Sequence, residues 1–171
     1  MAPTQPINDT LVQDSIVKAV QSVSRTMLRR ESTLLEAKVG DAHTNTLTKI
    51  GAAPYVIGNV GFAGDANGIV YLCFNDAFAQ HAASHILGMT PAEVAMEGHE
   101  VVKDVIGEIT NMTTGAFKNA LCDFGFPCKL SLPTIVRAEH ISIAAIKAAH
   151  RGIYLFSCGA DHLIADVQVK I

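Results

Sequence analysis

Apolar residues recur at helical spacing over residues 99–122, the longest helical pattern in the chain. At roughly 100° per residue, a helix here places small and branched apolar side chains along one side, which we expect to face the core. Gly125 and Pro127 follow the pattern and mark its end. The predicted core stripe consists of Val101, Val105, Ile109, Met112, Ala116 and Ala120.

Capping residues and apolar runs predict two further helices and a series of strands. Asn8 or Asp9 is suited to cap a helix that reaches about residue 30, and Asn75 or Asp76 a helix that reaches residue 87 and closes at Gly88. A turn-rich segment joins the second and third strands as a hairpin. The predicted strands are residues 35–39, 55–61, 69–74, 129–132, 141–149, 153–158 and 163–169.

This order of elements predicts an α+β fold in which helices cover an antiparallel sheet, because most consecutive strands are joined by short turns. A helix followed by three strands occurs twice, although the two halves show no literal sequence repeat. Residues 41–53 show no clear period and are expected to form a loop. Residues 1–8 are expected to be a flexible tail, and residues 9–171 a single domain.

Composition narrows the class of protein. Of the 171 residues, 49% are hydrophobic and 17% are charged, which is typical of a globular chain. The net charge of −3, without a cluster of basic residues, argues against a nucleic-acid partner. No apolar run is long enough to span a membrane, and the first residues lack the pattern of a signal peptide. We therefore expect a cytoplasmic protein whose four cysteines, which form no CxxC motif, are reduced.

Four residues stand at the edge of the core stripe in the long helix. Asp104, Glu108, Asn111 and Gly115 follow one another at three- and four-residue intervals, so they share one helical face. The glycine removes a side chain there and would allow another molecule to approach closely. The simplest interpretation is a solvated polar face, because short polar patterns on amphipathic helices are common.

Histidines offer the main alternative site in the sequence. His81 and His85 lie one helical turn apart, which is a spacing used by metal-binding helices. No glutamate follows His81 directly and no third ligand is evident, so two surface histidines are favoured and no metal site is predicted.

The polar pattern of the long helix resembles the signature of the CheX and CheC chemotaxis phosphatases. That signature begins with Asp or Ser, continues with Glu and Asn, and ends in a spaced proline, here Pro133. Three further segments are similar to CheX: YVIGNVGFAGDANGIVYLCF at 55–74, GEITNMTTG at 107–115 and LPTIV at 132–136. CheC carries its site on both of two repeated helices, whereas the first helix here offers Asp9, Gln13 and Ile16. The resemblance therefore implies a CheC-like fold of two pseudo-repeated αβ motifs with a single site, as in CheX.

The resemblance also implies a reaction, the hydrolysis of the aspartyl phosphate on a CheY-type receiver domain. Asn111 would orient the attacking water and Glu108 would dock the receiver, with Asp104, Thr114 and Gly115 at the contact surface. Mg²⁺ is expected on the receiver, and the chain is expected to need no cofactor of its own. The alternatives are a module that binds a receiver without catalysis, and a purely structural or oligomerising domain.

The late strands suggest an assembly. Residues 141–149, 153–158 and 163–169 are long, apolar and poor in charge, and an open edge formed by such strands is a liability unless it is covered. We expect a two-fold dimer in which the sheet continues across both subunits, as the resemblance to CheX also implies. The alternative is a monomer whose edge is covered by the N-terminal tail or by residues 41–53.

Overall fold

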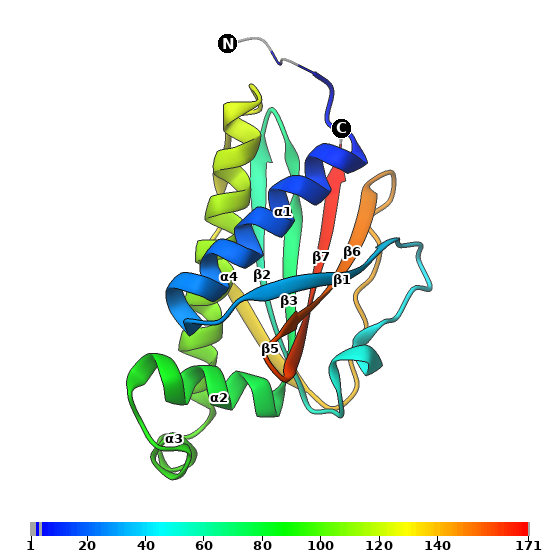
Figure 1. The fold of residues 1–171 in the computed structure, drawn as a ribbon. Helices are drawn as coiled ribbons and strands as arrows, with labels where there is room; N and C mark the ends of the chain where they lie inside the picture. The colour runs from blue at the N-terminus through cyan, green and yellow to red at the C-terminus, as the bar shows by residue number, and fades with distance from the viewer. Residues whose placement is uncertain (1–2, 4, 171) are drawn as a thin grey trace.

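Seven strands form one antiparallel sheet in the computed structural model, which describes residues 3 and 5–170 (Figure 1). The order across the sheet is β1-β6-β7-β3-β2-β4, and β5 pairs with the first half of β2, beside β4. The predicted α+β class with an antiparallel sheet is confirmed. The strands are β1 (Ser32–Val39), β2 (Tyr55–Gly64), β3 (Asn67–Asn75), β4 (Cys128–Leu130), β5 (Thr134–Ala138), β6 (His150–Cys158) and β7 (Asp161–Lys170).

The first two helices begin where capping residues predict. Asn8 accepts a hydrogen bond from the backbone N–H of Leu11 at 2.9 Å, and Asn75 accepts one from Phe78 at 2.8 Å. Thr90 opens a further short helix with a capping box. The α-helices are α1 (Asp9–Val23), α2 (Asp76–Leu87), α3 (Pro91–Glu97) and α4 (His99–Asp123), and shorter helical turns are η1 (Ser24–Leu28) and η2 (Leu47–Ile50).

One face of the sheet packs against α1 and α4, which lie beside each other over the strands (Figure 1). Ile7 is buried in this core and Asn8 caps α1, so the predicted tail boundary at residue 8 is wrong by two residues. Residues 1, 2 and 4 of that predicted tail lie outside the described part of the chain. Within the described part, no helix is both long and apolar enough to cross a membrane.

The core stripe of α4 is displaced by one position from the predicted one. Val105 and Ile109 are buried as expected, but the other four predicted residues are only half-buried. The helix packs against the sheet on one side and α1 on another, so its buried surface is wide and is centred on its largest apolar side chains. These are Ile106, Phe117 and Leu121, all fully buried.

The second face of the sheet is covered by irregular chain instead of helices. Residues 41–54, which include η2, and residues 139–149 lie over it, and they enclose a smaller apolar cluster. The predicted strand at 141–149 is therefore wrong. Its backbone bonds to the buried side chain of Gln168, which accepts from Ile146 N at 2.7 Å and donates to Ala144 O at 3.1 Å. A buried glutamine thus replaces the ladder that a strand would need.

A buried ion pair holds the other covering segment. The Arg151 guanidinium contacts both carboxylate oxygens of Asp166 through Nε, at 3.1 and 3.0 Å, and also donates to the carbonyl of Asp41 at 2.7 Å. Both side chains are almost fully buried. Residues 41–53 therefore form a fixed cover over the sheet.

Strand order changes the expected sheet edge. β6 lies between β1 and β7, and β7 between β6 and β3, so the late strands are internal and fully paired. The open edges belong to β1 and to β4 with β5. A dimer through the late strands is excluded because their backbone groups are already bonded.

Candidate functional site

The position of α4 is fixed by close packing along β2. A Cβ built on Gly58 would overlap Thr110 Oγ1 and lie 3.0 Å from Thr110 Cβ, so glycine lets the helix approach the strand. Further along, the rings of Phe62 and Phe117 meet edge to face with centroids 5.7 Å apart. The helix is therefore seated on rigid packing at both points.

The three threonines of α4 face inward. Thr110, Thr113 and Thr114 are buried, and each hydroxyl donates to the carbonyl four residues earlier, at 2.7 to 2.8 Å. Because the helix itself satisfies these hydroxyls, the threonines can be buried without other partners. The prediction that Thr114 lines a contact surface is wrong.

The remaining predicted site residues share the outer side of α4. Asp104 and Glu108 are exposed, and Asn111 and Gly115 are half-exposed. Neither carboxylate is in an ion pair with another residue in the described part of the chain, which leaves both free for a partner. A Cβ on Gly115 would meet nothing within 4 Å, so the surface is open there. The structure brings these four residues together, while their roles stay predictions.

The two glycines of α4 have different surroundings. A Cβ on Gly107 would lie 3.5 Å from Ile135 of β5, an ordinary van der Waals contact, so Gly107 faces the neighbouring strand. Gly115 faces open space instead. Nothing inside the described chain requires a glycine at 115, whose helix cost is about 1 kcal/mol relative to alanine.

The first helix carries no equivalent site. Ile16, which occupies the position corresponding to Asn111, is fully buried in the core, and Gln13 is half-buried. Ile16 is therefore not available at the surface of α1, and the single site stays a prediction. His81 Nδ1 lies 3.8 Å from Asp161 Oδ2. No group of three potential metal ligands occurs among residues 3 and 5–170.

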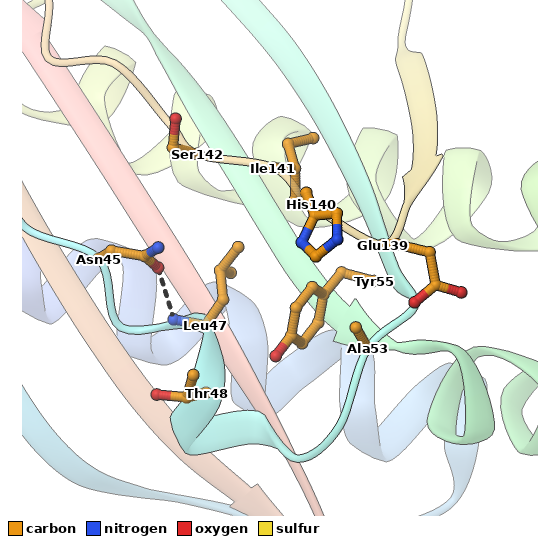
Figure 2. A pocket seen from close by; sticks show the side chains of 9 residues that line it. All are labelled: Asn45, Leu47, Thr48, Ala53, Tyr55, Glu139, His140, Ile141 and Ser142. Carbon is orange, nitrogen blue, oxygen red and sulfur yellow. Dashed lines mark hydrogen bonds between the residues drawn. The ribbon is translucent and has the colours of Figure 1, made fainter.

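A cavity lies on the other face of the sheet. It measures about 590 Å³ and opens between the two covering segments, with the ring of Tyr55 beside that of His140 (Figure 2). The Tyr55 hydroxyl donates to Gly51 O at 3.0 Å, and Asn45 Oδ1 accepts from Leu47 N at 3.2 Å. These polar groups are already satisfied within the chain, and none belongs to α4. The exposed face of α4 is the stronger candidate for the functional site, because a surface that binds another protein does not need a cavity of its own.

Comparison with known proteins identifies the family of this chain. The model of the family "Chemotaxis phosphatase CheX" matches residues 56–157, which include nearly all of β2, the whole of α4 and the strands from β4 to nearly the end of β6. The chain belongs to the CheX family of chemotaxis phosphatases. No curated protein sequence matches it.

Solved structures of the CheX and CheC-like type share the fold. A CheC-like superfamily protein from Shewanella sp. PV-4 is 23% identical with a TM-score of 0.78, over 96% of this chain and 100% of that one. CheX from Vibrio vulnificus is 23% identical with a TM-score of 0.76, over 93% and 99%. A chain of the CheX–CheY–BeF₃–Mg²⁺ complex from Borrelia burgdorferi is 20% identical with a TM-score of 0.73, over 94% and 98%.

Proposed function

We propose that this CheX-family chain hydrolyses the aspartyl phosphate of a CheY-type receiver domain. The observation that carries the proposal is the pair Glu108 and Asn111, which lie one turn apart on the open side of α4 in a chemotaxis phosphatase fold. A similar fold occurs in a complex whose components are CheX, CheY, BeF₃ and Mg²⁺. That complex supports a receiver as the partner.

The chemistry requires little from the phosphatase. An aspartyl phosphate is already activated, and hydrolysis needs a water in line with the phosphorus. The carboxamide of Asn111 can both donate and accept hydrogen bonds, so it can hold that water without acting as a strong base. Positioning of this kind is worth about 10²–10³ in rate.

Glu108 supplies the docking contact in this proposal. Its carboxylate is exposed and has no ion-pair partner among residues 3 and 5–170, so it is free to bind a lysine of the receiver. Asp104 lies one turn before Glu108 and Gly115 one turn after Asn111, at the two ends of the same face. We assign both to the contact surface.

No cofactor of its own is assigned to this chain. Mg²⁺, which neutralises the phosphoryl oxygens, belongs to the receiver in this proposal. Chelation is then expected to stop turnover through the receiver alone. A metal bound tightly to the purified phosphatase would contradict this.

The test is Asn111→Ala in a phosphate-release assay on phosphorylated receivers from the same cell. We expect kcat to fall about a hundredfold or more while receiver binding and unfolding stay near those of the wild type, since a half-exposed helical site tolerates alanine. Asn119→Ala is the comparison variant, because Asn119 is an exposed asparagine eight residues further along the same helix, beyond the assigned contact residues. Full turnover by a folded Asn111→Ala protein would overturn the role of Asn111.

The same assay separates catalysis from binding alone. A phosphatase accelerates receiver dephosphorylation when it is present in substoichiometric amounts, whereas a docking module protects or leaves unchanged only the receiver that it binds. If wild-type protein binds activated receiver without accelerating decay, the chain is a binding module.

A dimer through the sheet remains part of the proposal, with β1 as the joining edge. β1 pairs with β6 on one side only, and its residues Leu35 and Val39 are 53% and 73% exposed. An apolar edge strand of this kind is usually covered by a partner or by another segment. α4 lies over β2, near the opposite edge, so pairing through β1 leaves Glu108 and Asn111 accessible. A monomer mass by light scattering at micromolar concentration would refute the dimer.

A further inference from the structure

Leu132 lies in an irregularity of the sheet edge beside α4. Leu130 pairs with Phe62 of β2 and Thr134 pairs with Asn59, while Ser131 bonds to Gly61. Leu132 and Pro133 therefore stand opposite a single residue, Val60. Such bulges re-aim side chains at sheet edges and often occur next to active sites.

The level of this bulge along α4 follows from the packing on either side of it. Gly58 of β2 packs against Thr110 of α4, and Phe62 packs against Phe117. Val60 lies midway between the two strand positions, so the bulge is level with the helical residues between 110 and 117. That segment contains Asn111 and Gly115.

The bulge also lies on the side of α4 that borders the open face. β5 contacts α4 through Ile135 at Gly107, and β4 lies next to the helix further along. Asn111 follows Gly107 by one turn, so the bulge borders the open face that carries the proposed site. The edge strand and the helix face thus form one continuous surface.

The backbone around Leu132 is fixed. Ser131 N donates to Gly61 O at 2.9 Å, and Ser131 Oγ accepts from Gly61 N at 2.9 Å and donates to Leu132 O at 3.1 Å. Pro133 follows and restricts the next backbone dihedral. The Leu132 side chain is nevertheless 88% exposed, the largest exposure of any leucine in the described residues. A rigid segment that presents a leucine to water loses little conformational entropy on binding.

We propose that Leu132 is an apolar anchor for the receiver, buried against it when Asn111 reaches the phosphoryl group. The proposal rests on the proposed function, and its support is the continuity of the bulge with the Asn111–Gly115 face. Open space above Gly115 lets the partner surface come close to the helix. The leucine then contributes affinity, whereas Glu108 contributes charge-dependent docking and Asn111 contributes rate.

The experiment combines two measurements on Leu132→Ala: binding to a CheY-type receiver activated with beryllofluoride, and phosphate release from the phosphorylated receiver. We expect Kd and KM to rise about tenfold, with kcat unchanged. The loss should persist at high salt, because an apolar contact is not screened. Leu132→Met, which keeps the apolar volume, should bind within about twofold of wild type.

Leu87→Ala is the matched control, because Leu87 is an exposed leucine at the end of α2, a helix that carries none of the assigned contact residues. It should leave receiver binding unchanged. If Leu132→Ala binds like wild type while Asn111→Ala loses turnover, the anchor is refuted and the proposed function stands. If wild-type protein neither binds nor dephosphorylates a receiver, both are refuted.

Discussion

Gly58→Ala tests how closely α4 is seated on the sheet. The new Cβ would overlap Thr110 Oγ1, and would lie 3.0 Å from Thr110 Cβ and 3.2 Å from Ile135 Cδ1. Thr110 cannot rotate away freely, because its hydroxyl bonds to Ile106 O at 2.7 Å and its side chain is fully buried. The helix or the strand must therefore move.

The expected cost follows from overpacking a closely packed core. Adding one methyl group at such a site destabilises by about 1–3 kcal/mol, and we expect about 2 kcal/mol here since two neighbours are crowded at once. For a domain of this size the melting temperature should fall by about 4–8 °C. The displacement acts on the turn that holds Asn111, so kcat for receiver dephosphorylation should fall as well.

Urea unfolding of Gly58→Ala and Gly61→Ala measures this effect. Gly61 is the matched control on the same strand, where a Cβ would come no closer than 3.4 Å to Ser131 Oγ. Combining Gly58→Ala with Thr110→Ala, which removes the overlapping hydroxyl, completes a double-mutant cycle in which we expect coupling of about 1 kcal/mol. A Gly58→Ala protein as stable as Gly61→Ala would show that α4 is not seated on β2 in this way.

Three further predictions concern charge. Glu108→Ala should weaken receiver binding most at low salt, and a loss that is independent of salt would count against a lysine partner. Burial raises the pKa of Asp76, but hydrogen bonds and the ion pair with Arg137 outweigh it and hold this pKa below its usual value. The pair therefore stabilises the fold above about pH 4 and loses this effect as pH falls through the lowered pKa. The stability of Asp76→Asn in acid unfolding should depend less on pH in that range than the stability of the wild type. An identical pH dependence of the two proteins would refute the pair's contribution. Arg151→Met should lower the free energy of unfolding in urea by about 3–5 kcal/mol, because it leaves the Asp166 carboxylate buried and unpaired. The double variant Arg151→Met with Asp166→Leu should recover most of this loss. If the free energy of unfolding of the single variant is within about 1 kcal/mol of the wild-type value, the carboxylate is not held in this way.

Short-range signals in the sequence determined the helix starts and the composition of the site face. Asn8 and Asn75 bond to the first turns of α1 and α2, interactions that span only three residues. Asp104, Glu108 and Asn111 lie on one side of α4 because helix geometry alone fixes their spacing. These features do not depend on what the helix packs against.

Only the tertiary structure decided which sides of these elements are buried. Thr114 lies in the core although it is next to Gly115, because the sheet covers that side of α4 and the helix carbonyls satisfy the hydroxyl. The apolar run at residues 141–149 predicts a strand, yet the buried side chain of Gln168 binds the backbone there. The sheet that covers Thr114 and the Gln168 side chain are both distant in sequence from the segments they contact, so no local pattern records these contacts.

The strand order was likewise beyond the sequence. β6 and β7 are apolar, but apolar strands occur both inside a sheet and at its edge. Their composition therefore gave no indication that β1 pairs with β6 and makes both strands internal. The bulge at Leu132 depends on the register between β2 and two separate short strands, which is set by pairing across some 70 residues of chain. Periodicity is a property of neighbours along the chain, whereas burial, edges and register arise from contacts between distant segments.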